Sequence, residues 1–271
     1  MSWFDCGVNL FSRQFADKHS NILARAQAAG VEGCLLIASD LAECQLNLAL
    51  LNGPDECVNT SYSTAGVHPH QAANLAADWL LQLRQLLQQP KVLALGECGL
   101  DFNRDFSPRH IQQLVFAEQL ALAKACDKAV YLHERDAFEL QLSMLREQQI
   151  NRGIAHCFTG DTVQLAAYLD QGLYIGITGW LCDEKRNQQL AQALQYLPLD
   201  RLLLETDAPY LLPRNIRPRP KYNEPALLPY IAQEVAQRKG VSLEALAAQC
   251  RDNFQQLFFA GSDLATERTA T

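Results

Sequence analysis

Four side chains that can bind metal ions or move protons stand at the ends of short apolar runs in this sequence. They are Glu97, His133, His156 and Asp207. Imidazole nitrogens and carboxylate oxygens are common ligands of catalytic divalent cations, and carboxylates also accept protons from water. The pattern therefore favours metal-assisted hydrolysis, provided that the fold brings the four side chains together.

Each of these side chains also has a structural interpretation. A histidine at the end of a strand often forms a hydrogen bond within a loop, Glu97 could belong to a salt bridge, and Asp207 could cap the segment that follows it. However, Glu97 lies between Gly96 and Cys98 after an apolar run. A carboxylate there is costly to bury without a cation or a group of donors. This cost favours the functional interpretation.

Short apolar runs alternate with longer amphipathic segments along the chain. The runs predict strands at 4–9, 33–38, 62–66, 92–97, 129–133, 153–156, 173–177 and 202–205. The segments predict helices at 22–29, 41–51, 79–89, 111–126, 137–147, 163–171, 187–196, 225–238 and 243–259. Strict alternation is typical of a parallel sheet, and eight units favour a closed (β/α)₈ TIM barrel over an open sheet. No GxGxxG follows the first strand, as a dinucleotide-binding open sheet would require.

The 271 residues suit one barrel, so we expect a single domain over residues 1–271 with a polar tail from about residue 261. In a barrel, the carboxyl ends of all strands meet at one rim, where active sites are built. Asp5 and Asn9 on the first strand would join the four side chains at this rim.

Further candidates follow the third and eighth strands. His68 and His70 flank Pro69 and match no usual zinc spacing, so we expect one of them to contact a phosphate or a loop. The loop after the eighth strand carries the cations Arg214, Arg217, Arg219 and Lys221. Four cations in one loop suit phosphate capture as well as a solvated loop.

Charge and composition limit the partners. The formal net charge is −7, which argues against a protein that grips duplex DNA through its backbone, although bound cations can reverse the local sign. The nine cysteines show no CxxC pair, so we expect reduced thiols of a cytoplasmic protein. No run is long enough for a membrane span and no signal peptide is evident. We expect a monomer.

Several sequence blocks resemble one known family. They are Gly96–Phe102, His133, His156–Gly160 and Glu205–Leu211, with further similarity at Gly66–His70, Gly176–Trp180 and Asn223–Pro225. These long, ordered blocks resemble the TatD deoxyribonucleases, and the similarity extends over about residues 3–260.

The resemblance implies an amidohydrolase-like metal-dependent barrel with one or two divalent cations that hydrolyses DNA ends. By position, Glu97, His133 and His156 resemble metal ligands. Asp207 resembles a carboxylate that binds metal and orients the attacking water, and His68 resembles a phosphate contact. Arg214 is our choice from the basic loop as a second substrate contact.

One block departs from most of the family. Most relatives begin with Asp-x-His-x-His, whereas this chain has Gly7 and Asn9 in place of the two histidines. In this respect it resembles a bacterial subgroup described as magnesium-dependent 3′-5′ exonucleases on single-stranded DNA and RNA. Losing two imidazoles favours an oxygen-rich site, which suits Mg²⁺ or Mn²⁺. We expect a weakly held, exchangeable metal.

The resulting hypothesis is metal-assisted hydrolysis of a phosphodiester bond. Asp207 would orient or deprotonate water, and Asp5 or Asn9 would help to hold a second cation. Trp180 or Tyr210 could stack on a terminal base, but either could equally pack in the barrel, which we favour for Trp180. One alternative is another hydrolase on the same scaffold, acting on an amide, lactone or phosphotriester. A second is a barrel that has lost catalysis and acts as a binding partner.

Overall fold

Parallel strands make up the centre of the molecule. The computed structural model describes residues 1–260, so the tail expected from residue 261 lies outside the described residues. Within residues 1–260, eight strands form one sheet in sequential order, and neighbours are parallel. The strands are β1 (Trp3–Val8), β2 (Val31–Leu36), β3 (Tyr62–Ala65), β4 (Val92–Asp101), β5 (Ala129–Arg135), β6 (Gly153–Ala155), β7 (Tyr174–Ile177) and β8 (Leu202–Leu204). A parallel bridge between Val8 and Ala208 brings β1 beside the end of β8, which confirms the predicted TIM barrel.

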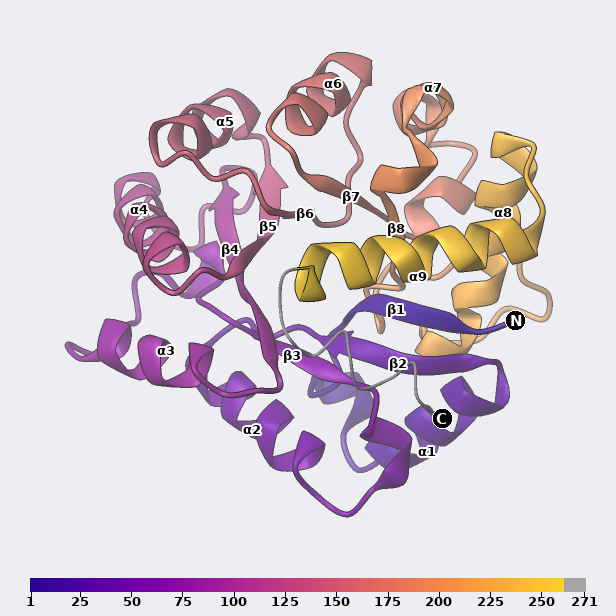
Figure 1. Ribbon diagram of the computed structural model, residues 1–271, viewed down its shortest axis with the longest axis horizontal. Coiled ribbons are helices and arrows are strands. Elements are labelled where there is room, and N and C mark those ends of the chain that lie inside the picture. Colours follow the sequence, from indigo (N-terminus) through magenta and orange to yellow (C-terminus); the bar gives the residue numbers. More distant parts are fainter. Residues whose placement is uncertain (261–271) are drawn as a thin grey trace.

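Helices cover the outside of the strands (Figure 1). They are α1 (His19–Ala28), α2 (Leu41–Leu51), α3 (Trp79–Leu87), α4 (Arg109–Ala125), α5 (Phe138–Glu147), α6 (Thr162–Asp170), α7 (Gln188–Tyr196), α8 (Leu228–Lys239) and α9 (Leu243–Phe259). Short 3₁₀ turns are η1 (Arg13–Phe15), η2 (Glu56–Val58), η3 (Pro69–Gln71), η4 (Gly179–Cys182), η5 (Leu199–Arg201) and η6 (Pro225–Leu227). Within residues 1–260, no helix has both the length and the apolar character needed to cross a membrane.

The strands are apolar on both faces because both faces are buried. On β2, Leu35 belongs to a cluster inside the barrel, whereas Cys34 and Leu36 belong to the larger core between strands and helices. The C-terminal helix α9 crosses one end of the barrel (Figure 1). Its Phe254 packs on Phe4 with ring centroids 3.9 Å apart, so this end of the barrel is filled.

The structure corrects some predicted boundaries. Strand β4 does not end at Glu97, and β5 does not end at His133, because the two strands stay paired as far as Asp101 and Arg135. Glu97 therefore lies within a strand, at a register irregularity between Gly96 and Cys98. The segment predicted as a helix at 225–238 is the 3₁₀ turn η6 followed by α8.

Candidate active site

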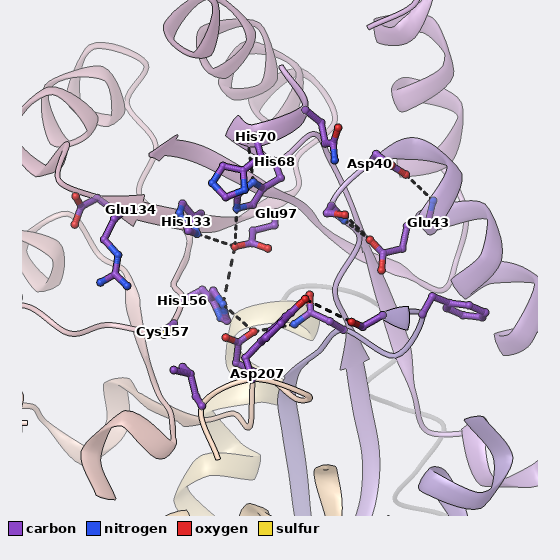
Figure 2. Close-up of a pocket in the computed structure, with 18 of the residues that line it drawn as sticks. Asp40, Glu43, His68, His70, Glu97, His133, Glu134, His156, Cys157 and Asp207 are labelled. Carbon is purple, nitrogen blue, oxygen red and sulfur yellow. Dashed lines mark hydrogen bonds and ion pairs between the residues drawn. The ribbon is translucent and has the colours of Figure 1, made fainter. Parts of the chain in front are cut away.

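A pocket of about 650 Å³ opens at the rim where the strands end. Glu97, His133, His156 and Asp207 all line it, as does His68 from the loop after β3 (Figure 2). The structure therefore brings together five of the six predicted site residues from five different strands or strand ends. This is the position at which barrel enzymes place their catalytic groups.

Glu97 is the centre of the cluster. Its Oε1 lies 3.0 Å from Nδ1 of His133, 3.6 Å from Nε2 of His68 and 4.0 Å from Nε2 of His156. His68, Glu97 and His133 offer ligand atoms that lie within 4.8 Å of one another, and we call them the Glu97 group. One carboxylate oxygen therefore faces imidazoles from three neighbouring parts of the rim.

Asp101 holds the far side of the Glu97 group. Its Oδ2 lies 3.2 Å from Nε2 of His133 and 2.7 Å from Nε2 of His70. Both nitrogens of His133 thus face carboxylates, Glu97 on one side and Asp101 on the other. This arrangement explains the position of His70, which is oriented by Asp101 at the edge of the pocket.

Three residues form the other side of the pocket, and we call them the His156 group. His156, Cys157 and Asp207 also offer ligand atoms within 4.8 Å of one another. Nε2 of His156 lies 3.7 Å from Oδ1 of Asp207, and the amide of Asn9 donates to the same oxygen at 2.8 Å. Asn9 therefore fixes the rotamer of Asp207. The sequence did not predict this role for Asn9.

Buried groups behind His156 determine how its ring presents itself. Oε2 of Glu205 lies 2.7 Å from Nδ1 of His156, and the Tyr131 hydroxyl donates to the same oxygen at 2.8 Å. The backbone N–H of Cys157 donates to the other oxygen of Glu205. Because Glu205 accepts the hydrogen on Nδ1, Nε2 of His156 is directed into the pocket.

The same buried groups account for Gly7 on β1. A β-carbon at Gly7 would collide with the Tyr131 hydroxyl and lie 2.9 Å from Oε2 of Glu205. The space that a longer side chain would need is therefore filled by Tyr131. In this chain, Asn9 reaches the pocket directly after β1, and β1 itself carries no imidazole.

The hypothesis that Asp5 helps to hold a second cation is wrong. Asp5 is fully buried, and its oxygens accept hydrogen bonds from the backbone of Gly7 and from the backbone and hydroxyl of Thr206. Asp5 does not line the pocket. It instead ties β1 to the segment after β8, where the barrel closes.

Buried glutamines on α4 and α5 fix the segments that carry the site. Gln119 accepts from the backbone N–H of Val67 at 2.8 Å and donates to its carbonyl at 3.0 Å, directly before His68. Gln112 accepts from the N–H of Asp101 at 2.8 Å, and Gln141 accepts from that of Leu100 at 3.0 Å. These bonds satisfy backbone groups at the rim, where the strand ladder ends.

The electrostatics of the site reflect its crowding. Burial opposes ionisation of Glu97, but the neighbouring imidazoles outweigh it and hold the pKa of Glu97 below its usual range. Burial lowers the pKa of His68 to about 3 and raises the pKa of Asp207 to about 7. Burial also opposes the charging of His133 and His156, yet adjacent carboxylates raise the pKa of these imidazoles to about 9 and about 10.

These features fit a bound divalent cation. Carboxylates and imidazoles from both groups converge within a few ångströms, and without a cation the imidazoles carry the protons that balance the carboxylate charge. A cation that displaced those protons would meet the mixture of nitrogen and oxygen donors that catalytic metals use. The residues present therefore suit a divalent metal.

The structure does not bring Arg214 into the pocket. Its Nε lies 2.8 Å from Oδ2 of Asp183, and the pocket lining does not include Arg214. The cation that does line the pocket is Arg135, whose guanidinium lies 5.9 Å from the ring centre of Trp180. Trp180 and Tyr210 both line the pocket, as a base-stacking role would require.

Tyr131 and Arg135 were missed by sequence reasoning although a signal existed. In a strand, alternate residues point to the same face. Tyr131 and Arg135 stand two residues before and two residues after His133 on β5, so the predicted position of His133 also predicts theirs. The role of Glu205 had no such local signal.

The closed barrel and its cluster of carboxylates and imidazoles define an amidohydrolase-like, metal-dependent hydrolase. The sequence matches the family described as TatD related DNase over residues 4–259, and the chain belongs to this family. A relative from Erwinia tasmaniensis named 3′-5′ ssDNA/RNA exonuclease TatD is 46% identical over 260 residues, 94% of this chain and 99% of that protein. A Klebsiella pneumoniae protein of the same name is 46% identical and covers 94% of this chain and 97% of its own.

Solved structures agree with this assignment. The crystal structure of a TatD homologue from Escherichia coli K12 has a TM-score of 0.85 and 28% identity, covering 94% of this chain and 97% of that one. A TatD family hydrolase from Entamoeba histolytica has a TM-score of 0.84 at 24% identity over 96% of this chain and 98% of that one, which shows the shared fold.

Proposed function

We propose that this protein is a metal-dependent 3′-5′ exonuclease acting on single-stranded DNA and RNA. The observation that carries the proposal is the convergence of Glu97, His133, His156 and Asp207 in one pocket. The names of relatives that are 46% identical over nearly the whole chain support the substrate and the direction of digestion.

In this proposal Glu97, His133, His156 and Asp207 hold one or two divalent cations. Mg²⁺ is the proposed metal, with Mn²⁺ as an alternative, because β1 adds no imidazole to the two carboxylates and two imidazoles of this set. The bound metal would supply charge stabilisation at the phosphate and make water more acidic. The nine free cysteines fit the reducing cytoplasm as the proposed location, and we propose a monomer.

Asp207 is the proposed base for the attacking water. Asn9 occupies one lone pair of its Oδ1, which keeps the carboxylate directed into the pocket. Burial raises the pKa of Asp207 to about 7, and a base with a pKa near the working pH transfers protons efficiently. Asp207 thus combines a fixed direction with a suitable basicity.

His68 is the proposed phosphate contact. Its Nδ1 accepts a hydrogen bond from the backbone N–H of His70 at 3.1 Å, so its Nε2 carries a hydrogen. With its pKa lowered to about 3 by burial, His68 stays neutral at physiological pH. A neutral imidazole with Nε2–H is a donor to a phosphate oxygen and does not offer this nitrogen to a metal. Arg135 is a further phosphate contact in place of Arg214.

The shape of the molecule suits the binding of one terminus of a nucleic acid strand. One end of the barrel is filled by α9, and the other holds a pocket large enough for a nucleotide. The net charge of −7 provides little attraction for a duplex. A single strand that inserts its terminus into the pocket meets both constraints.

The test uses the purified protein with 5′-labelled single-stranded DNA and RNA oligonucleotides in Mg²⁺, in Mn²⁺ and in EDTA, beside Asp207→Ala. We expect stepwise shortening from the 3′ end that needs a metal and Asp207. The absence of shortening under any metal, with a folded protein, would overturn the proposal. Cleavage that Asp207→Ala leaves unchanged would point to a contaminating nuclease.

A further inference from the structure

One wall of the pocket is acidic and comes from the loop between β2 and α2. Ser39, Asp40 and Glu43 line the pocket on this side. In Figure 2, Asp40 and Glu43 lie across the pocket from Glu134. Ser39, Asp40 and Glu43 belong neither to the Glu97 group nor to the His156 group, so metal binding does not explain their function.

Hydrogen bonds hold the side chain of Glu43 in place through only one of its two carboxylate oxygens. Its Oε2 accepts hydrogen bonds from the backbone N–H of Ser39 at 2.9 Å and from the Ser39 hydroxyl at 2.5 Å. Its own N–H donates to Oδ1 of Asp40, the N-cap of α2, at 2.8 Å. Within residues 1–260, Oε1 of Glu43 accepts no hydrogen bond. A fixed carboxylate oxygen is thus available at the pocket wall.

Glu43 faces the same pocket as Glu97, because both residues line it. Burial raises the pKa of Glu43, and the negative charges of Asp40 and of Glu97 raise it further. A terminal phosphate placed against Asp40 and Glu43 would therefore meet negative charge.

The opposite wall carries the cation Arg135 next to the carboxylate Glu134. Arg135 is exposed and lines the pocket, and within the described part of the chain it forms no ion pair. Phosphates of a bound strand are attracted to this side, whereas the wall of Asp40 and Glu43 repels them. The pocket therefore has a direction, with backbone phosphates toward Arg135 and an uncharged group toward Glu43.

The two ends of a nucleic acid strand differ in the same way. The 3′-terminal sugar ends in a hydroxyl, whereas a 5′ terminus commonly carries a phosphate. A carboxylate oxygen accepts a hydrogen bond from a hydroxyl and repels a phosphate. The end that suits the acidic wall is thus a 3′ end with a free hydroxyl.

Building on the proposed exonuclease function, we propose that Glu43 accepts a hydrogen bond from the terminal 3′-hydroxyl of the bound strand. Ser39 positions Glu43 for this contact. The contact selects hydroxyl ends, excludes 3′-phosphorylated ends and sets the direction of digestion.

The experiment compares three 5′-fluorescein-labelled DNA oligonucleotides that end in a 3′-hydroxyl, a 3′-hydrogen or a 3′-phosphate. Initial rates are measured with the intact protein in Mg²⁺. We expect removal of the first nucleotide to be about tenfold slower from the 3′-phosphate end than from the hydroxyl end, because of like-charge repulsion. The 3′-hydrogen end should lie between them, since it lacks the donor but adds no charge.

The decisive variant is Glu43→Gln, which keeps an oxygen for Ser39 and removes the negative charge. It should reduce the difference between the rates on the phosphate and hydroxyl ends from about tenfold to about threefold or less, because only Asp40 then repels the phosphate from this wall. Its KM for the hydroxyl end should rise more than its kcat falls. Glu139→Gln is the matched control, since Glu139 is exposed and lies outside this pocket. Thermal unfolding of each variant checks the fold.

The outcomes separate this inference from the function on which it rests. Equal rates on all three ends in the wild-type protein, or unchanged discrimination in folded Glu43→Gln, would overturn the role of Glu43 alone. A wild-type protein that shortens none of the oligonucleotides would overturn the proposed function itself.

Discussion

The Glu97 group and the His156 group face each other across the pocket but are held in different ways. In the Glu97 group, His133 is clamped directly between two carboxylates, and the contacts join neighbouring strands. In the His156 group, the side chains that reach the pocket rest on a buried set, Glu205 with Tyr131, and on Asn9. The Glu97 group brings charged side chains close together, whereas the His156 group fixes the orientation of the side chains that reach the pocket.

This difference indicates a division of labour. A buried carboxylate oxygen that lies within 4.0 Å of three imidazoles is suited to hold a cation, because oxygen and nitrogen ligands are then available around one point. An aspartate with an assigned hydrogen bond and a raised pKa is suited to move a proton. We therefore expect changes at Glu97 to affect metal binding first and changes at Asp207 to affect turnover first.

The largest effect is expected for Glu97→Gln, which removes the charge that both groups share. We expect kcat/KM on a single-stranded oligonucleotide to fall about ten thousandfold, because several kcal/mol of charge stabilisation are lost with the metal. Steady-state cleavage assays measure this. A loss below tenfold would mean that Glu97 is not the centre of the site.

The next largest effect is expected for Asp207→Asn, which keeps the contact geometry and removes the base. We expect kcat to fall about a thousandfold, within the range for loss of a general base. KM should change little, which single-turnover kinetics can test. A change in KM with kcat preserved would assign Asp207 to substrate binding and break the proposed division.

A smaller effect is expected behind His156. Glu205→Gln should lower activity about 10- to 100-fold, because partners that orient a ligand imidazole contribute at this level. The matched change in the other group is Asp101→Asn, where Glu97 still holds the ring of His133. We expect the loss in Asp101→Asn to be smaller. Equal losses in the two variants would show that both groups are positioned in the same way.

The pH dependence of metal binding should follow the two imidazoles. Nearby carboxylates raise the pKa of His133 to about 9 and of His156 to about 10, so both rings are protonated in the metal-free protein at pH 7. A metal must displace these protons, so its affinity should rise with pH, by about tenfold per pH unit for each proton released. Calorimetric titrations between pH 6 and 8 test this. A constant affinity would exclude these imidazoles as ligands.

The same shifts predict how the metal-free protein responds to pH. An imidazole whose pKa is raised on folding stabilises the fold below its unfolded pKa, and this contribution is lost as pH rises through the folded pKa. For His133 the loss extends from about pH 6.5 to about 9. Denaturant unfolding without metal should therefore show declining stability over this range, and the decline should be smaller in His133→Gln.

Local patterns in the sequence were sufficient to predict most of the fold. Helices α2 and α9 begin and end at the predicted residues, and their starts are fixed by the N-caps Asp40 and Ser242, whose side chains accept backbone hydrogen bonds. The strands were recognised because a barrel strand is apolar on both faces. Strand β4 was predicted too short because the residues after Glu97 include the glycine Gly99 and the carboxylate Asp101, and pairing with β5 maintains the strand nonetheless.

The site was predictable where it depended on strand ends and unpredictable where it depended on distant partners. Glu97, His133 and His156 reach one pocket because the fold turns the carboxyl-terminal parts of all strands toward one rim, although β4 and β5 continue past Glu97 and His133. No local sequence pattern shows that Asp5 accepts a hydrogen bond from Thr206 or that Arg214 pairs with Asp183. Likewise, no local pattern shows that Tyr131 fills the space beside Gly7. These contacts form only when β1 closes against the end of β8.

Binding of Mn²⁺ to the metal-free protein tests the division between the two groups most directly. The free ion is followed by electron paramagnetic resonance during titration of wild type, Glu97→Gln and Asp207→Asn. We predict that Glu97→Gln weakens binding about a hundredfold, whereas Asp207→Asn weakens it less than about tenfold although turnover is lost. Undiminished Mn²⁺ binding by folded Glu97→Gln, or equal weakening in both variants, would contradict the account.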